Sequence, residues 1–142
     1  SARNGILAAD PQSEFVAIHD GARPLIQPEE IDRAVRLAYQ TGAVCCGTKP
    51  KSTVKQTDKN GFIAFTPKRD ALFEAATPQI FRKEQILSAM EAEKDRLADF
   101  TDDCSIAEKH GIPIKTCLCS YENIKITTDD DLLLAELLLK NR

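Results

Sequence analysis

The chain has 142 residues, of which 42% are hydrophobic and 29% charged, a composition that indicates one folded domain and excludes a disordered chain. A formal net charge of -3 provides no broad basic surface for a nucleic acid, so a bound phosphate would need a local cluster of cations. No apolar run reaches the length of a membrane span, and the first ten residues lack the basic-then-apolar pattern of a secretory signal.

The first three predicted elements form a β-α-β unit. Residues 14–20 (EFVAIHD) are a short apolar run that opens into a polar loop, as a buried strand does at its carboxyl end. A helix is predicted from Pro28, which suits the first helical position, to a stop at Gly42. Residues 43–50 (AVCCGTKP) read as a second buried strand, so we expect a mostly parallel sheet.

Residues 51–67 do not continue the alternation of strands and helices. They contain two stretches rich in Thr, Val, Phe and Ile on either side of Asn60-Gly61. Asn-Gly is a strong hairpin signal because both residues tolerate a positive φ. The hairpin has little apolar surface of its own to bury. Its residues alone favour two interpretations equally: an arm that packs on another molecule, or an exposed surface hairpin.

The rest of the chain continues the α/β pattern. Residues 72–81 are expected to form a strand that runs into a turn at Pro78. A further extended piece, which contains Lys125, is expected at 123–126. No linker, repeat or low-complexity stretch divides the sequence, so we expect one α/β domain over residues 1–142. The other elements that the pattern predicts are helices at 83–97, 101–111 and 127–142 and a strand at 112–120.

Five cysteines are an odd number, and no two of them have the spacing of a zinc knuckle. This argues against a disulfide scaffold and favours small buried thiols in a reducing cytoplasm. The cysteines are Cys45, Cys46, Cys104, Cys117 and Cys119.

Candidate ligand-binding residues stand where strands are expected to end, which is where open parallel sheets bind ligands. Asp20 offers an acceptor for sugar hydroxyls or a metal, and Arg23 offers a forked donor for phosphate, although the two could simply pair around a turn. Thr77 could bind a substrate hydroxyl or cap the turn before Pro78. Lys125 could stabilise a reacting phosphate, or it could be an edge lysine that reaches solvent.

Several reaction classes are excluded by what the sequence lacks. No Ser or Cys has a nucleophile-elbow context, and two histidines are too few for a histidine-rich metal site. No G-x-G-x-x-G or G-x-x-x-x-G-K-[ST] motif occurs, so a Gly-rich cradle for a triphosphate is not encoded in these residues.

Taken in order, the motifs resemble the 2-C-methyl-D-erythritol 4-phosphate cytidylyltransferase family. The resemblance runs through nearly the whole chain, and five motifs in register carry it. They are VAIHDGARP, KSTVK, the T-P-x-R-x-x-L-x-x-A-x-T-P-Q-x-F pattern of 66–81, T-D-D-x-S from Thr101, and ENIKIT before an acidic-led helix.

The resemblance implies a Rossmann-like nucleotidyltransferase fold, a three-layer α/β/α sandwich with a protruding β-hairpin arm at 48–70 that joins two subunits into a homodimer. It implies that CTP and methylerythritol phosphate react in the presence of Mg²⁺. No metal ligand is assigned to this chain, although the carboxylate of Asp20 is chemically able to be one. The expected location is the cytoplasm, or the plastid if the source is a plant. Neither a membrane nor a nucleic acid is an expected partner.

The resemblance also assigns roles to individual residues. Lys125 matches the lysine that stabilises charge at the reacting phosphate. Thr53 and Arg69 match arm residues that reach the acceptor phosphate of the neighbouring subunit. The acceptor itself is expected to be held by Asp20, Gly21, Arg23 and Thr77.

The sequence departs from the family in one respect. Family members begin with a Gly-rich segment of the P-A-A-G-x-G-x-R-M type that wraps the CTP phosphates, and no such segment is present here. We therefore expect the chain to be a carboxyl-terminal part that does not turn over CTP alone. Three alternatives stay open: a pentitol- or ribulose-phosphate cytidylyltransferase, a non-catalytic remnant that keeps acceptor binding and dimerisation, and a plain structural α/β domain.

Overall fold

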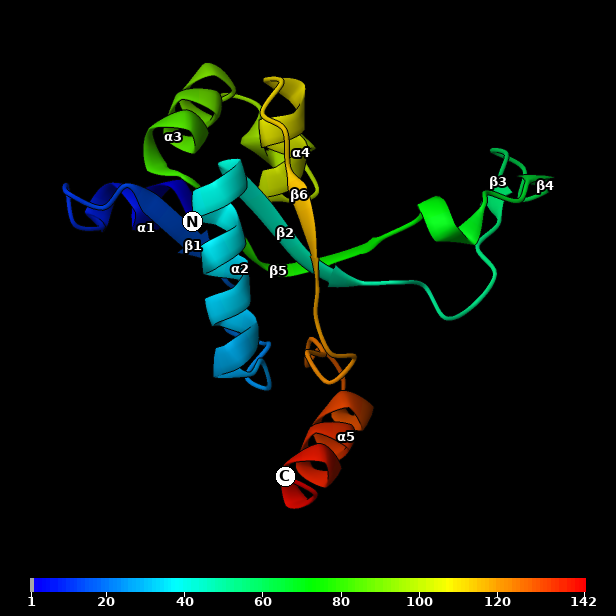
Figure 1. Ribbon diagram of the computed structural model, residues 1–142. Helices are drawn as coiled ribbons and strands as arrows, with labels where there is room; N and C mark the ends of the chain where they lie inside the picture. Colours follow the sequence, from blue (N-terminus) through cyan, green and yellow to red (C-terminus); the bar gives the residue numbers. More distant parts are fainter. Residues whose placement is uncertain (1) are drawn as a thin grey trace.

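The computed structural model describes residues 2–142 and is built around a four-stranded mixed sheet (Figure 1). The strands are β1 (Phe15–Ile18), β5 (Glu74–Arg82), β2 (Ala43–Thr48) and β6 (Lys115–Leu118), in that spatial order. β6 is parallel to β2, whereas β5 lies between β1 and β2 and is antiparallel to both. Three of the four strands therefore run in one direction, as the predicted β-α-β unit requires.

Helices cover both faces of the sheet, which confirms the expected three layers. On one face α2 (Pro28–Thr41) packs its buried Ala34 and Ala38 against the apolar side chains of β2, β5 and β6. On the other face lie α1 (Ala2–Ala8), α3 (Lys83–Ala92) and α4 (Asp103–Lys109). The apolar cluster between these helices and the sheet includes Phe81, which is fully buried.

Residues 48–70 leave the body of the molecule, and Figure 1 shows them projecting to one side of the sheet. β3 (Gln56–Thr57) and β4 (Ile63–Phe65) pair as an antiparallel hairpin that turns at Gly61, whose φ is 87°. This confirms the predicted hairpin. Its large apolar side chains are exposed, with Phe62 at 73% and Ile63 at 62%.

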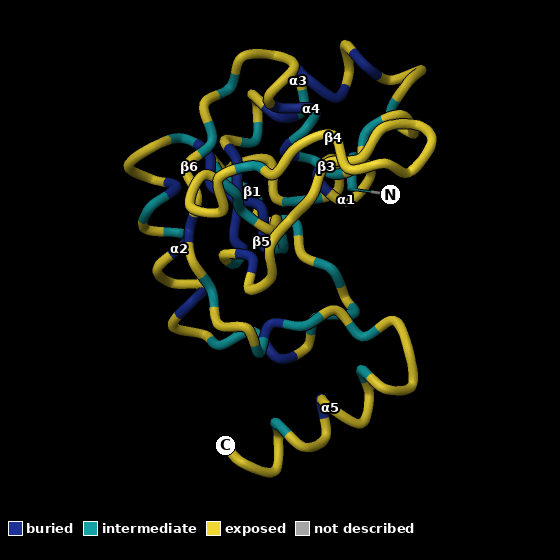
Figure 2. The backbone as a smooth tube through the Cα atoms, turned by 90° about the vertical axis from the view of Figure 1, so that its right-hand side faces the viewer, coloured by how far each residue is buried: buried dark blue, intermediate teal, exposed yellow. Residues whose placement is uncertain are grey.

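The last helix, α5 (Asp129–Lys140), lies at one end of the molecule, and in Figure 2 its surface is almost wholly exposed. The Thr128 hydroxyl accepts a hydrogen bond from the backbone N–H of Asp131 and so caps the helix. Only Ala135 of this helix is buried, whereas five of its leucines are exposed. The five are Leu132, Leu133, Leu134, Leu137 and Leu139.

Three local expectations were wrong. The strand expected to stop at Pro78 continues to Arg82, and the proline is tolerated because the β2–β5 ladder is interrupted between Cys45 and Gly47. The extended piece at 123–126 belongs to no sheet, and its backbone is held by the bond from Ile126 N–H to the carbonyl of Ala22 (2.8 Å).

The helix expected at 83–97 ends at Ala92. Beyond it, the carboxylate of Glu93 turns to α4, where it accepts from Lys109 Nζ at 2.8 Å and contacts the His110 ring at 3.0 Å. α1 was not predicted at all. Its anchor is a single buried side chain, Ile6, which is too little to produce an amphipathic signal in seven residues.

Candidate functional site

Asp20 is the centre of the candidate site. Its Oδ2 atom lies 3.2 Å from Nζ of Lys125 and accepts a hydrogen bond of 3.2 Å from Nε of Arg23. Both cations therefore share one carboxylate oxygen. The side chains of Asp20 and Lys125 are 33% and 48% exposed, so a ligand from solvent can reach them.

Local structure brings these charges together. Asp20 lies two residues after the end of β1, and a turn closed by the bond from Arg23 N–H to the Asp20 carbonyl (3.0 Å) brings the guanidinium back to the carboxylate. Lys125 comes from the segment between β6 and α5, which the bond between Ile126 and Ala22 fixes beside this turn. The predicted Asp20–Arg23 pair exists, and Lys125 lies beside it as a third member of the cluster.

Thr77 joins the site from a different direction than predicted. It lies inside β5, not after a strand, and β5 runs antiparallel to β1. The register pairs Ile18 with Gln79, so the backbone N–H of Asp20 meets the Thr77 hydroxyl at 3.0 Å. The hydroxyl therefore faces the cluster although its expected position at a carboxyl strand end was wrong.

Two residues that received no role from the sequence complete the site. Asn123 is 6% exposed; its Nδ2 donates to the Thr77 carbonyl (2.9 Å), and its own carbonyl accepts from Nη1 of Arg23 (2.8 Å). The Oδ1 atom of Asn123 is buried and has no partner in the described part of the chain. His19 contacts both the Thr77 hydroxyl and the Arg23 carbonyl at 3.0 Å. The sequence signal that could have found them is that His19 precedes Asp20 and that Asn123 lies two residues before Lys125.

The electrostatics of the cluster favour an ionised carboxylate. Partial burial acts to raise the pKa of Asp20, but the hydrogen bonds and charges of Lys125 and Arg23 outweigh it, so the net shift is downward. Asp103, in the first turn of α4, behaves in the opposite way. Burial raises its pKa, and the charges of Asp102 and Asp20 add to the shift.

The structure does not join the predicted arm residues to this cluster within one chain. Thr53 is exposed, and Arg69 donates to the carbonyl of Lys51 (3.1 Å) at the base of the hairpin. Among residues 2–142, no hydrogen bond or ion pair connects either of them to Asp20 or Lys125. Gly21 lies in the turn with no atom within 4 Å of where a Cβ would stand, so this chain alone does not require a glycine there.

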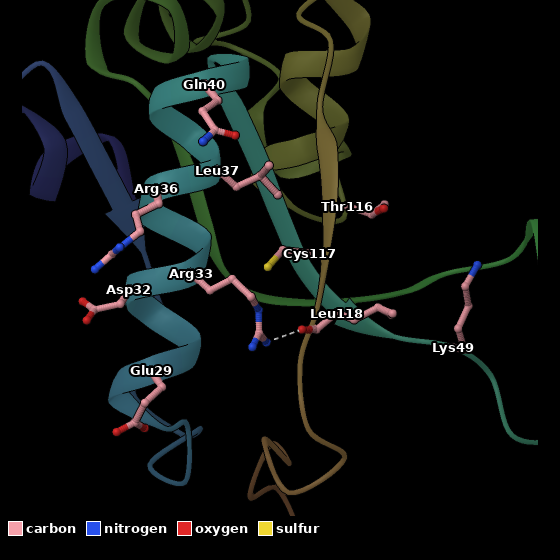
Figure 3. Close-up of a pocket in the computed structure, with 10 residues that line it drawn as sticks. All are labelled: Glu29, Asp32, Arg33, Arg36, Leu37, Gln40, Lys49, Thr116, Cys117 and Leu118. Atoms are coloured by element: carbon pink, nitrogen blue, oxygen red, sulfur yellow. Dashed lines mark hydrogen bonds between the residues drawn. The ribbon is translucent and has the colours of Figure 1, made fainter.

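A cavity of about 1060 Å³ lies elsewhere, between α2 and β6 (Figure 3). Its charged lining residues are Arg33, Arg36 and Lys49 together with Glu29 and Asp32. Arg33 donates to the Leu118 carbonyl at 2.6 Å. None of the predicted site residues lines it. The predicted binding residues Asp20, Arg23, Thr77 and Lys125 therefore lie in the open cluster around Asp20 and not in this cavity.

The described residues do not fit a magnesium site by themselves. Among residues 2–142, no group of three or more His, Cys, Asp or Glu side chains could hold a metal ion. The one carboxylate of the cluster, Asp20, already shares Oδ2 with two cations.

The described residues, 2–142, include no helix that is long and apolar enough to cross a membrane.

A three-layer α/β fold with Asp20 and Arg23 just beyond the end of its first strand is that of the Rossmann-like nucleotidyltransferases. The comparisons define the family within this class. The sequence model for 2-C-methyl-D-erythritol 4-phosphate cytidylyltransferase matches residues 1–141, and the chain belongs to that family.

Individual relatives agree. The chain is 40% identical, over its full length, to the 2-C-methyl-D-erythritol 4-phosphate cytidylyltransferase of Desulforamulus reducens, and 43% identical over 99% of its length to that of Caldanaerobacter subterraneus subsp. tengcongensis. It spans 61% and 62% of those proteins' own lengths. The crystal structure of 4-diphosphocytidyl-2C-methyl-D-erythritol synthase from Anaerococcus prevotii superimposes with a TM-score of 0.92 at 36% identity, covering 99% of this chain and 63% of that one.

Proposed function

We propose that this chain carries the acceptor-binding part of a cytidylyltransferase that joins CTP and 2-C-methyl-D-erythritol 4-phosphate. The products are 4-diphosphocytidyl-2-C-methyl-D-erythritol and pyrophosphate, and the reaction belongs to non-mevalonate isoprenoid biosynthesis. One observation carries the proposal: Asp20, Arg23, Thr77 and Lys125, scattered along the sequence, meet in one solvent-accessible cluster. The names of the relatives favour this acceptor over a pentitol or ribulose phosphate.

The proposed chemistry needs both kinds of group that the cluster holds. An oxygen of the acceptor phosphate attacks the α-phosphorus of CTP, the new P–O bond forms, and the bond to the β-phosphate breaks. Lys125 stabilises the negative charge that collects on the phosphoryl oxygens, because a pre-placed cation needs no reorganisation during the reaction. Arg23 orients the acceptor, while Asp20 and Thr77, supported by the turn at Gly21, bind its hydroxyls.

The hairpin at 48–70 is proposed as a dimerisation arm. Its support is the exposed apolar surface of Val54, Phe62, Ile63 and Phe65, which nothing in residues 2–142 covers. In a homodimer of this kind, Thr53 and Arg69 of one subunit would serve the acceptor phosphate in the other. This explains why the structure leaves them apart from Asp20 within one chain.

CTP binding is proposed to depend mainly on residues outside this sequence, since the chain contains no Gly-rich phosphate-binding motif. A divalent cation is proposed because the family to which the chain belongs implies one. Bound Mg²⁺ would neutralise phosphate charge. The cytoplasm is the proposed location, in keeping with five unpaired cysteines.

Calorimetric titration with methylerythritol phosphate tests acceptor binding directly. The chain should bind this acceptor, Lys125→Ala and Arg23→Ala should each weaken binding, and Lys140→Ala on α5 should leave it unchanged. Equal binding in all four proteins would refute the assignment of the site. Separately, the chain mixed with CTP, Mg²⁺ and the acceptor should release no pyrophosphate, and release at rates typical of the family would contradict the proposed dependence on further residues.

A further inference from the structure

The hydroxyl of Thr77 has two fixed neighbours whose hydrogen-bonding roles can be worked out. The first is the backbone N–H of Asp20, 3.0 Å away. A backbone N–H can only donate, so Oγ1 of Thr77 accepts this bond with one of its two lone pairs. The second neighbour is Nδ1 of His19, also at 3.0 Å, and its role depends on which ring nitrogen carries the proton.

The other side of the histidine ring decides that question. Nε2 of His19 lies 3.0 Å from the backbone carbonyl of Arg23, which can only accept. In the neutral ring Nε2 therefore carries the proton, and Nδ1 is left as an acceptor. It follows that the Thr77 hydroxyl donates its single proton to Nδ1 of His19.

We propose that His19 is a positioning residue that makes Thr77 an acceptor-only group toward the ligand. With its proton bound to His19 and one lone pair bound to Asp20, the hydroxyl presents one free lone pair to the site. Such a group binds an alcohol O–H and repels a phosphate or carbonyl oxygen. The Asp20 carboxylate is also an acceptor, so both groups select hydroxyls, while Lys125 and Arg23 are left to hold the phosphate.

This assignment deepens the proposed function, on which it rests for the identity of the ligand as a phosphorylated polyol. The direction of the Thr77 bond does not rest on it. That direction follows from three contacts within the chain, so it can be measured without any ligand.

The first experiment is long-range ¹H–¹⁵N NMR of the uniformly ¹⁵N-labelled chain at about pH 8, where histidine is ordinarily neutral. The spectrum of His19→Gln assigns the signals of His19 against those of His110. We expect the Nε2–H tautomer, with Nδ1 at the shift of an unprotonated acceptor nitrogen. An Nδ1–H tautomer, or an equal mixture of the two, would overturn the proposal.

The second experiment separates the two contacts of the ring with a matched pair of variants. In His19→Asn, the amide oxygen stands near the position of Nδ1 and can still accept from Thr77. In His19→Gln, the amide reaches toward the Arg23 carbonyl and leaves no acceptor beside Thr77. Calorimetry with methylerythritol phosphate should show affinity within about twofold of wild type for Asn and a loss of about fivefold for Gln, the usual effect of one neutral hydrogen bond.

Inorganic phosphate is the control ligand, and its affinity should be the same in both variants because Lys125 and Arg23 hold it. Equal acceptor affinity for the Asn and Gln variants, or an equal loss for phosphate, would contradict the proposal. Circular dichroism melting excludes a folding defect. If the wild-type chain binds no methylerythritol phosphate, the proposed function fails for this chain, while the NMR result still decides the role of His19.

Discussion

The carboxylate of Asp20 and the ammonium group of Lys125 lie 3.2 Å apart although they come from opposite ends of the chain. The contact joins the loop after β1 to the segment that precedes α5. Lys125 is half exposed, so the pair contributes little to stability by itself. The contact keeps a cation and a hydrogen-bond acceptor side by side where both are open to solvent.

Replacing Lys125 should therefore affect binding more than folding. Lys125→Ala is expected to weaken binding of the phosphorylated acceptor about tenfold or more, since a hydrogen bond to a charged group contributes about 1.5–3 kcal/mol. The free energy of unfolding should change by less than about 1 kcal/mol. Calorimetry and urea denaturation measure the two effects, and a large loss of stability with unchanged binding would assign Lys125 a structural role instead.

The pKa of Asp20 offers a second measurement. Because its pKa is lower in the folded chain than in the unfolded one, its contribution to stability is present above the unfolded pKa and is lost as the pH falls through the folded pKa. A ¹³C carboxyl titration should show Asp20 ionised to lower pH than an ordinary aspartate. In Lys125→Ala the midpoint should move upward, and an unchanged midpoint would show that Lys125 does not act on Asp20 in solution.

Gly47 should tolerate no side chain. A Cβ at this position would stand 2.2 Å from the Glu74 carbonyl oxygen and 2.6 Å from the Phe73 ring, where the β2–β5 ladder is irregular. Gly47→Ala is therefore expected to lower the free energy of unfolding by about 3 kcal/mol in urea denaturation. Gly5→Ala on α1 is the matched control, because no atom lies within 4 Å of its Cβ position. Equal stabilities of the two variants would contradict the close approach.

Tyr121 is expected to hold the base of the hairpin arm. Its hydroxyl donates to the Lys49 carbonyl (2.8 Å), and Nζ of Lys51 lies 3.9 Å from the centre of its ring. Tyr121→Phe removes the hydrogen bond only, so trypsin should cleave after Lys51 and Lys55 about fivefold faster. Tyr121→Leu should have a larger effect because the cation–π contact is also lost.

The other tyrosine of the chain provides the control for the arm. Tyr39 lies on α2 and packs against Phe15, away from residues 48–70. Tyr39→Phe should leave cleavage of the arm unchanged. If Tyr121→Phe behaves like Tyr39→Phe, the hydrogen bond to Lys49 does not restrain the arm in solution.

Local patterns were sufficient for the elements that bury a regular face. β1, α2, β2 and β6 were found because apolar runs, Pro28 and Gly42 mark their positions. The hairpin was found from Asn60-Gly61. The failures at β5 and α3 have a common cause, which is that non-local contacts decided where these two elements end. β5 passes through Pro78 because of its neighbours in the sheet, and α3 ends early where Glu93 pairs with α4.

The sequence by itself determined an α/β domain, an exposed hairpin, the family and the chemical suitability of Asp20, Arg23, Thr77 and Lys125. Composition and short-range spacing encode the fold class, the hairpin and the suitability of these residues, whereas the family was identified from the resemblance of five motifs. Only the tertiary structure decided that the four side chains meet, that Thr77 enters from an antiparallel strand, and that His19 and Asn123 orient their neighbours. The reason is physical: the direction of a hydrogen bond depends on which donor and acceptor the strand register brings within 3 Å, and no local pattern carries that register.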